Sequence, residues 1–460
     1  MKKLFVVLLM VPLFFSCNQE SGDANLTKIT GIADNLEAGL FVLGSPGGVK
    51  DTVQIDGAHS FDFTIVEIEK PGNYYLLSEK DYFPMYIAPG MQLDIYFDKA
   101  DFMGSLNFGG PGADINNYKV DKTRDFGPVE SEVYTKEPAA FRAWNDSILT
   151  AQQSLLNEAA KDNANDPFWA QEEGELLYSW AMLFGNYPSY YKYYSEGNEV
   201  DLPEDFDSYK EKLNINDVKY LASPAFKNFV NAAIREVVSE KVKAQEGLNR
   251  SLVTLETGME LLTNIEVLDD FMLSTITGRM QWTDLSEMTE EIEFFKANCD
   301  NEASLAEFNE QYEAWGKLAK GAPAFVFEGH DLDGKLVKFS DFKGKYVYVD
   351  IWATWCGPCK YEIPFLKQLE ADYHDKNIVF LSYSIDEDKD AWLKFVPENE
   401  LGGVQIIGEN AWESQLCKDY KIRGVPTFMF FDPAGNILNV KMSRPSAQAT
   451  RDAFDSYADL

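Results

Sequence analysis

Cysteine and histidine are both scarce in this chain of 460 residues. The five cysteines are too few to hold a protein of this length together as a disulfide scaffold, so a dedicated redox pair explains them better. The three histidines, His59, His330 and His374, are scattered, and no two of them have the spacing of a zinc ligand pair. The sequence therefore predicts neither a disulfide-stapled fold nor a metal centre.

Positive charge is also in short supply. Lysine and arginine number 41 against 75 aspartates and glutamates, which gives a formal net charge of −34 at pH 7. Most of this excess lies before residue 321. Such a field repels phosphate backbones and anionic lipid headgroups, so we expect no nucleic-acid partner and no membrane docking through a basic surface. A solubilising surface is the ordinary interpretation of this charge.

The N-terminus lacks an apolar run long enough to cross a bilayer. Residues 4–15 are apolar, follow Lys2 and Lys3, and precede Ser16 and Cys17, an order typical of a signal peptide. A cysteine directly after such a run resembles the lipobox of bacterial lipoproteins, so residues 1–17 are predicted to be a lipoprotein signal peptide with lipidation at Cys17. Ordinary cleavage beside an incidental cysteine is the alternative. Lipidation would tether the folded part outside the cytoplasm.

Two regions of different periodicity precede the last third of the chain. Residues 18–115 hold short alternating runs separated by turn signals, such as 28–32, 60–65 and 92–97, which predicts a small β-sandwich domain. Residues 116–318 carry apolar side chains at helical spacing and are predicted to form an α-helical domain, in which Tyr187-Pro188 interrupts one helix. Both regions are predicted to position or select partners for the domain that follows them.

Residues 319–460 alternate between strand and helix patterns and are predicted to form an α/β domain. Strands are expected at 325–327, 336–339, 346–352, 378–384, 404–407, 427–431 and 436–441. Helices are expected at 358–373, 391–396, 411–420 and from 446 onward. Strands separated by helical stretches call for a mostly parallel sheet that is covered on both faces.

A Cys-x-x-Cys motif, Cys356 to Cys359, lies where the buried strand 346–352 meets a helix. A helix N-terminus supplies unpaired N–H donors and a positive partial charge that stabilise a thiolate, and Cys356 lies at that end. Cys356 can then attack a substrate disulfide and be displaced by Cys359. Pro358 suits the first turn of a helix, and Gly357 leaves the approach to Cys356 open. This motif predicts thiol–disulfide exchange.

Three motifs in order resemble thioredoxin-fold proteins of the TlpA/ResA type. They are Gly344-Lys345, Trp352-Ala353-Thr354-Trp355-Cys356-Gly357-Pro358-Cys359 and Gly424-Val425-Pro426-Thr427-Phe428. The resemblance implies a thioredoxin fold over residues 319–460 and a thiol–disulfide oxidoreductase that faces the cell envelope of a Gram-negative bacterium. It also implies protein thiols and disulfides as substrates, an upstream membrane electron donor or acceptor, and membrane attachment through a lipid anchor. Residues 18–115 similarly resemble the β-rich domain that precedes thioredoxin domains in envelope lipoproteins.

The resemblance also implies roles for residues around the cysteine pair. Pro426 matches a proline that is cis in the family and lies against the disulfide, so Val425 and Pro426 are expected to bind substrate backbone. Trp355 is expected to cover the rim of the site. Gly357 and Pro358 complete the predicted substrate-binding set.

Two acidic residues match catalytic positions of the resembled proteins. Asp350 matches the buried carboxylate that exchanges a proton with Cys359, and burial in an apolar strand should raise its pKa. Glu362 matches a glutamate near the active site and is a candidate second acid or base. A hydrogen-bonded core carboxylate is the alternative interpretation of Asp350, and an exposed helix-face residue is that of Glu362.

Other functions remain as alternatives at this point. Peroxidase chemistry would need a Pro-x-x-x-Thr-x-x-Cys pattern, which is absent. A binding lipoprotein that captures a peptide, glycan or partner, with the thioredoxin domain as scaffold, is a rival of a different class. Cys417 is expected to be a buried apolar residue or a third redox thiol, and Cys299 is undecided. No metal or organic cofactor is expected, and the Gly-Pro dipeptide favours a reductase, whose substrate, an apocytochrome or a misoxidised protein among others, stays open.

Overall fold

The computed structural model describes residues 27–36, 39–45, 48–55, 60–65, 68, 70–78, 81–458 and 460. The predicted signal peptide and Cys17 lie outside these residues. The chain divides into two compact units, the first extending to Ile215 and including Lys219–Phe229. The second comprises Asn216–Val218 and Val230–Leu460. Helices from the region predicted as one domain, 116–318, therefore contribute to both units.

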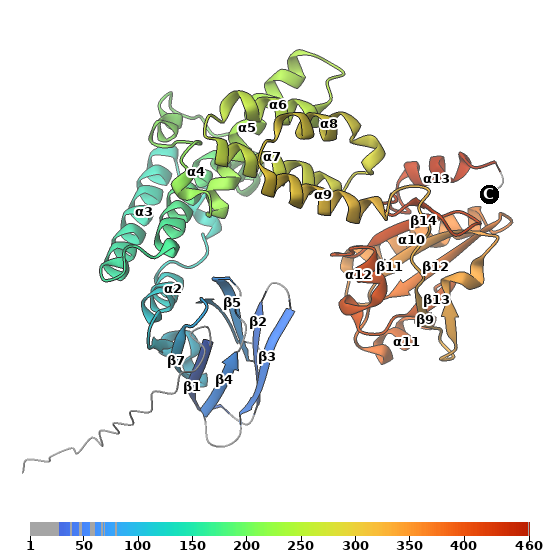
Figure 1. Cartoon of the computed structure of the whole chain (residues 1–460), viewed down its shortest axis with the longest axis horizontal. Coiled ribbons are helices and arrows are strands. Elements are labelled where there is room, and N and C mark those ends of the chain that lie inside the picture. The colour runs from blue at the N-terminus through green and yellow to red at the C-terminus, as the bar shows by residue number, and fades with distance from the viewer. Residues whose placement is uncertain are drawn as a thin grey trace, which may run out of the picture. The chain divides into compact units, whose positions relative to one another are not determined.

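The first unit begins with two four-stranded sheets, drawn in blue in Figure 1. The strands are β1 (Thr27–Asp34), β2 (Gly39–Ser45), β3 (Gly48–Ile55), β4 (Ser60–Ile65), β5 (Gly72–Ser78), β6 (Asp81–Ile87), β7 (Gln92–Asp98) and β8 (Asn107–Gly109). They are ordered β4-β1-β7-β8 in one sheet and β3-β2-β5-β6 in the other. Side chains from both sheets, such as Ile29, Phe63 and Leu76, share one core. This arrangement confirms the predicted β-sandwich.

Two local features of the sandwich follow from single residues. A Cβ at Gly31 would come within 2.2 Å of the Phe61 ring, so a glycine is needed for that close approach. Strand β6 contains Pro84. The proline is tolerated because β6 is the edge strand of its sheet, where a missing N–H donor costs little.

Helices occupy the middle of the chain. They are α1 (Phe102–Ser105), α2 (Ala113–Asp125), α3 (Pro138–Ala160), α4 (Pro167–Tyr194), α5 (Pro224–Ala244), α6 (Arg250–Leu261), α7 (Ile265–Met280), α8 (Thr289–Asn298) and α9 (Glu302–Gly316). In the first unit α3 packs on α2 and α4, and in the second α7 packs on α6, α8 and α9. None of the described helices combines the length and the apolar character that a membrane span requires.

The predicted interruption at Tyr187-Pro188 is wrong, because α4 continues through Pro188 to Tyr194. Packing explains the difference. The Tyr187 ring is fully buried and stacks on Phe141 at 4.2 Å between ring centroids. Its hydroxyl donates a hydrogen bond to the Lys136 carbonyl at 2.6 Å. These contacts hold the chain in place where the proline removes one helical hydrogen bond.

The C-terminal part of the second unit is an α/β domain with the predicted thioredoxin fold, drawn in orange and red in Figure 1. Its strands are β9 (Glu328–His330), β10 (Leu336–Lys338), β11 (Tyr346–Trp352), β12 (Ile378–Ser384), β13 (Val404–Ile407), β14 (Thr427–Phe431) and β15 (Ile437–Asn439). Its helices are α10 (Gly357–Asp372), α11 (Lys389–Glu398), α12 (Gln415–Asp419) and α13 (Gln448–Asp455). The sheet order is β10-β9-β13-β12-β11-β14-β15.

Strand direction in this sheet differs from the sequence-based prediction. Among the described strands of this sheet, only β11, β12 and β13 run parallel to a neighbour, whereas β14, β15, β9 and β10 each join an antiparallel neighbour. A tight turn between β14 and β15 forces that pair to be antiparallel. The expected mostly parallel sheet is thus confined to its centre. Apolar side chains of α10 and α13 share one core with residues of β11, β12 and β14.

The helices of the second unit are joined to this sheet through direct contacts. The Gly321 N–H donates to the Ile437 carbonyl at 2.7 Å, and the Ile437 N–H donates to the Ala322 carbonyl at 2.8 Å. Lys441, just after β15, donates to the carbonyls of Met280 and Thr283 at the end of α7. The segment after α9 therefore continues along the edge strand of the sheet.

Candidate active site

Cys356 and Cys359 form a disulfide at the first turn of α10, with their Cα atoms 5.3 Å apart. Cys356 is the N-cap residue of this helix, and the Cys359 N–H points to its sulfur at 3.1 Å. Pro358 lies in the first turn, where its missing N–H leaves no gap in the helical ladder. The parallel strand β11 ends at Trp352 and leads directly into this turn, which is why the pair lies at the carboxyl edge of the sheet.

The surroundings of the disulfide combine a buried pair with an open approach. Cys356 and Cys359 are each 4% exposed. Gly357 and Pro358 are exposed beside them, and a Cβ at Gly357 would meet no atom within 4 Å. Trp355 is 56% exposed and its ring centroid lies 6.1 Å from that of Trp412. The sequence prediction that Trp355 lies at the rim agrees with this exposure.

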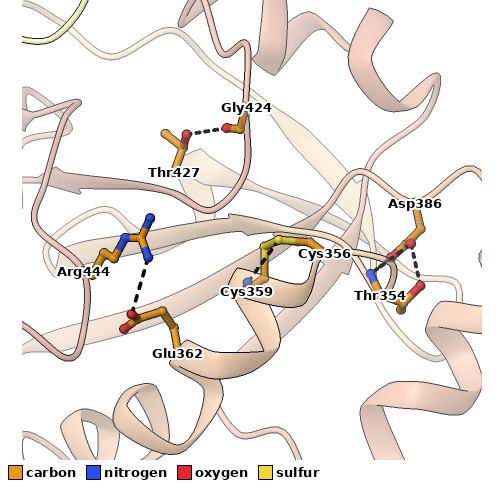
Figure 2. The surroundings of a disulfide bond; sticks show 8 residues. All are labelled: Thr354, Cys356, Cys359, Glu362, Asp386, Gly424, Thr427 and Arg444. Carbon is orange, nitrogen blue, oxygen red and sulfur yellow. Dashed lines mark hydrogen bonds and ion pairs between the residues drawn. A yellow bond between two sulfur atoms is a disulfide. The ribbon is translucent and has the colours of Figure 1, made fainter. Parts of the chain in front are cut away.

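The loop before β14 lies at the same edge of the sheet as the disulfide, because Thr427 at the start of β14 pairs with Ile351 near the end of β11. The peptide bond between Val425 and Pro426 is cis. The Thr427 hydroxyl donates to the Gly424 carbonyl at 2.7 Å and ties the loop together, as Figure 2 shows above the two cysteines. Val425 and Pro426 are both partly exposed. The structure therefore brings the predicted substrate-binding residues to the same edge as the cysteine pair.

Asp350 borders a cavity of about 10 Å³ that also touches Cys359 and Glu370. Burial raises the pKa of Asp350 from an ordinary 3.8 to about 8, and the charges of Glu370 and Glu362 add to the rise. Burial likewise raises the pKa of Glu370 to about 7, against an opposing effect of Lys367. Two carboxyl groups that hold protons near neutral pH thus lie beside the inner cysteine.

Glu362 lies on α10, and in Figure 2 its side chain points toward Arg444 and away from the disulfide. It is 3% exposed. Its carboxylate accepts hydrogen bonds from the Ser446 N–H at 3.0 Å and the Ser446 hydroxyl at 2.9 Å. Arg444 lies 3.9 Å away. The alternative of an exposed helix-face residue does not apply to Glu362, because its carboxylate is buried and bonded.

Asp386 is a buried carboxylate that the sequence analysis missed. It accepts hydrogen bonds from the Thr354 N–H at 3.0 Å, the Thr354 hydroxyl at 2.7 Å and the Ser384 hydroxyl at 2.7 Å. These bonds, partly visible in Figure 2, fix the turn that carries Trp355 and Cys356. One signal was available: Asp386 lies two residues after the end of strand β12, and parallel neighbours end at the same edge of a sheet.

The other described cysteines take no part in the disulfide. Cys299 and Cys417 are free and buried, and burial raises the pKa of both thiols. Cys417 therefore fits the buried apolar residue better than a third redox thiol. Across the described ranges, no group of three or more histidine, cysteine or acidic side chains is placed to hold a metal ion.

A cysteine pair capping a helix, after a buried parallel strand and opposite a cis-proline loop, defines a thioredoxin-fold thiol–disulfide oxidoreductase. Comparisons with known proteins agree with this class. The Redoxin family matches residues 317–455. The thiol-disulfide oxidoreductase ResA of Bacillus thuringiensis is 32% identical over 141 residues, which cover 31% of this chain and 76% of that protein. ResA of Bacillus subtilis is 29% identical over 119 residues, or 26% of this chain and 64% of that protein.

Among solved structures, the thioredoxin domain of a thiol-disulfide oxidoreductase from Bacteroides vulgatus is 30% identical. The match covers 30% of this chain and 97% of that chain, with a TM-score of 0.28. The family assignment rests on the sequence relatives. Through its C-terminal domain, the chain belongs to the family of ResA thiol-disulfide oxidoreductases.

Proposed function

We propose that this protein reduces disulfide bonds of client proteins through Cys356 and Cys359. The observation that carries the proposal is the placement of Cys356 as the cap of α10, with the Cys359 N–H directed at its sulfur at 3.1 Å. In the reduced pair this donor and the positive end of the helix stabilise a thiolate at Cys356. The outer cysteine is then the nucleophile and the inner one resolves the intermediate.

The reaction transfers two electrons from the dithiol to the client. The Cys356 thiolate attacks one sulfur of the client disulfide, forms a mixed disulfide, and the other client sulfur leaves as a thiolate that takes up a proton. Cys359 then loses its proton and attacks the Cys356 sulfur. The second client sulfur departs as a thiolate, and the Cys356–Cys359 disulfide results. An electron donor must reduce this disulfide before the next cycle.

We propose that Asp350 accepts the proton that Cys359 releases, because the two residues border the same cavity. The cavity has room for about one water molecule. Trp352 and Gln405, which also line it, each carry a buried polar atom that lacks a hydrogen-bond partner in the described part of the chain. A water bonded to these groups would connect Asp350 with Glu370 and carry the proton outward. Glu362 acts on this system through its charge, which helps to raise the pKa of Asp350.

Client binding is proposed to use the exposed surface around the pair. Val425 and Pro426 offer backbone and ring contacts on one side, and Trp355 offers an aromatic face on the other. Gly357 and Pro358 leave space between them through which a client sulfur reaches Cys356. This accounts for access to a pair that is itself nearly buried.

The proposed location is the cell envelope of a Gram-negative bacterium, periplasmic or surface-facing. It rests on the sequence of residues 1–17, in which an apolar run ends at Cys17 as in a lipidated signal peptide. Attachment through Cys17 would place the thioredoxin domain outside the cytoplasm, beside a membrane protein that supplies its electrons. Release of the protein from membranes by Cys17→Ser would support this proposal, and unchanged membrane attachment would contradict it.

Insulin reduction in the presence of dithiothreitol tests the proposed activity. We expect the wild-type chain to accelerate insulin precipitation and Cys356→Ser to abolish that acceleration. Cys417→Ala, which removes a buried thiol outside the pair, is the matched control and should retain activity. An inactive wild-type protein would favour a binding lipoprotein in which the thioredoxin domain serves as a scaffold.

A further inference from the structure

A groove of about 620 Å³ begins at the cis-proline loop and extends away from it within the second unit. Its walls are the loop at 422–428, the segment at 440–444, the turn residues Gln281 and Trp282 just after α7, and Trp315 near the end of α9. A volume of this order is typical of a ligand site. The helices that the redox chemistry leaves unexplained thus contribute directly to a surface beside the cysteine pair. We call this surface the Trp282 groove.

Tryptophan dominates the helical wall of the groove. Trp282 is 82% exposed, so most of its indole ring is open to an incoming side chain. Trp315 is 9% exposed and is held by Lys441, whose Nζ lies 4.2 Å from the ring centroid. Tryptophan is enriched among the residues that dominate binding energy at protein interfaces. One fixed and one free indole therefore form an apolar wall that suits an incoming side chain.

The charges of the groove are opposite to those of the chain as a whole. Lys421, Arg423, Lys441 and Arg444 line it, and no carboxylate is found among its described lining residues. The full chain, by contrast, carries a net charge of −34. A local concentration of cations in so acidic a protein favours an anionic partner.

Two of these cations remain available to a ligand. Lys441 is occupied by the carbonyls of Met280 and Thr283 and lies near Asp284, and Lys421 lies over the Trp315 ring. Arg423 is exposed and forms no ion pair with any residue that the structure describes. Arg444 faces Glu362 at 3.9 Å, but that carboxylate is already bonded to Ser446. Arginines beside an exposed indole can bind the carboxylate side chains of a peptide.

A second pocket, next to Trp355, has the opposite character. It has a volume of about 500 Å³ and is lined by Trp355, Trp412 and the acidic run Asp386, Glu387 and Asp388. None of its described lining residues is a lysine or an arginine. The two pockets therefore carry opposite charges, cations in the Trp282 groove and carboxylates at Trp355. A client segment that extends from its cysteine into one pocket would meet a charge opposite to that met by a segment in the other pocket.

We propose that the Trp282 groove binds the client polypeptide next to its disulfide and selects segments in which carboxylates flank an aromatic side chain. The proposal rests on the reductase function proposed above and names the class of client. Val425 and Pro426 belong to both the groove and the predicted substrate-binding set. A segment held in the groove would place the adjoining client disulfide at Cys356, and the helices before residue 318 would serve to choose the client.

Four synthetic peptides closed by one disulfide test this specificity. They carry either Glu-Phe-Glu or Lys-Phe-Lys, placed before the first cysteine in one pair and after the second cysteine in the other. The reduced full-length mature protein is mixed with each peptide, and single-turnover rates are followed over peptide concentration. We expect the acidic peptide of one pair to react about tenfold faster at subsaturating concentration, through tighter apparent binding, with the preference declining as salt increases.

Variants assign the preference to the groove. Arg423→Glu and Trp282→Ala should each reduce the ratio of acidic to basic rates toward one. Both residues are exposed, so neither change removes core packing. Lys394→Glu, which reverses an exposed charge on α11 outside the groove, should keep the wild-type ratio. Since each ratio compares two peptides on one protein, a general effect on the cysteine chemistry cancels.

The uncharged substrate hydroxyethyl disulfide separates failure of the groove from failure of the activity. If the wild-type protein reduces it but treats all four peptides alike, the proposed specificity is overturned while the reductase function stands. A preference for acidic peptides that survives both Arg423→Glu and Trp282→Ala would also overturn the groove. If hydroxyethyl disulfide is not reduced, the reductase function fails and this proposal fails with it.

Discussion

Asp350 on β11 and Glu370 on α10 border the same small cavity, directly behind Cys359. Burial raises the pKa of Asp350 to about 8 and that of Glu370 to about 7, and the proximity of the two carboxyl groups adds to the first of these shifts. Each group can therefore change its protonation state near neutral pH. The buried Asp350 that is proposed to accept the proton of Cys359 therefore also makes the stability of the thioredoxin domain depend on pH.

Asp350→Asn should stabilise the protein at neutral and alkaline pH. The folded state keeps its proton up to about pH 8, whereas an unfolded aspartate loses it near its ordinary pKa of 3.8. Between these values the unfolded chain binds fewer protons, so wild-type stability falls as the pH rises and levels off above about 8. The variant lacks this loss, which amounts to on the order of 5 kcal/mol at most.

Urea unfolding of the wild type and Asp350→Asn at pH 5 and pH 8 measures this difference. The free-energy advantage of the variant should be larger at pH 8. Asp333→Asn, at an exposed position in the turn after β9, is the matched control and should show little pH dependence relative to wild type. An advantage that is equal at both pH values would show that Asp350 ionises normally in the folded protein.

Glu370→Gln should move the pH dependence of the second chemical step to lower pH. The negative charge of Glu370 opposes ionisation of Asp350, so its removal lowers the pKa of Asp350 and makes the carboxylate available as a base under more acidic conditions. The measurement is the rate at which Cys359 releases a client from a preformed mixed disulfide with Cys356, between pH 5.5 and 9. Glu398→Gln, at an exposed position on α11, should leave the midpoint where it is. An unchanged midpoint in Glu370→Gln would show that Glu370 does not influence the ionisation of Asp350.

Asp386→Ala should destabilise the turn that carries Cys356. The carboxylate is 4% exposed and accepts bonds from Thr354 and Ser384, whose donors would be left buried without it. Loss of such partners costs about 1–3 kcal/mol for each group. We expect the free energy of unfolding to fall by about 3 kcal/mol in chemical denaturation. Glu387→Ala, its exposed neighbour, should change stability by less than about 0.5 kcal/mol, and equal effects of the two changes would contradict the role of Asp386.

The sequence predicted the centre of the α/β domain closely, for a local reason. Strands β11, β12, β13 and β14 have the expected bounds, because each is a short apolar run buried on both sides. Strand direction is set by the route of the chain between elements, which local pattern does not contain. Helix α4 likewise continues past Pro188 because tertiary contacts of Tyr187 outweigh the local effect of proline.

The same distinction applies to the site. Cys356 and Cys359 lie in one contiguous motif and were recognisable at once. Glu370 belongs to the face of α10 that starts at Cys359, at helical spacing through Ile363 and Leu366, and all four residues line the cavity. That periodicity was present in the sequence and could have identified it.

The Trp282 groove had no such signal. Trp282 and Arg423 are separated by more than a hundred residues of sequence, and only the fold brings them to one surface. Its cations are also hidden in the sequence by the acidity of the chain as a whole.

An equilibrium redox titration of the Cys356–Cys359 pair tests the central claim most directly. The mature protein is equilibrated in dithiothreitol buffers, the free thiols are alkylated, and the reduced fraction is read by mass. The account predicts a single two-electron transition near about −270 mV, the range of thioredoxin. A midpoint near about −120 mV, the range of strong oxidants such as DsbA, or a pair that does not respond to the buffer, would contradict it.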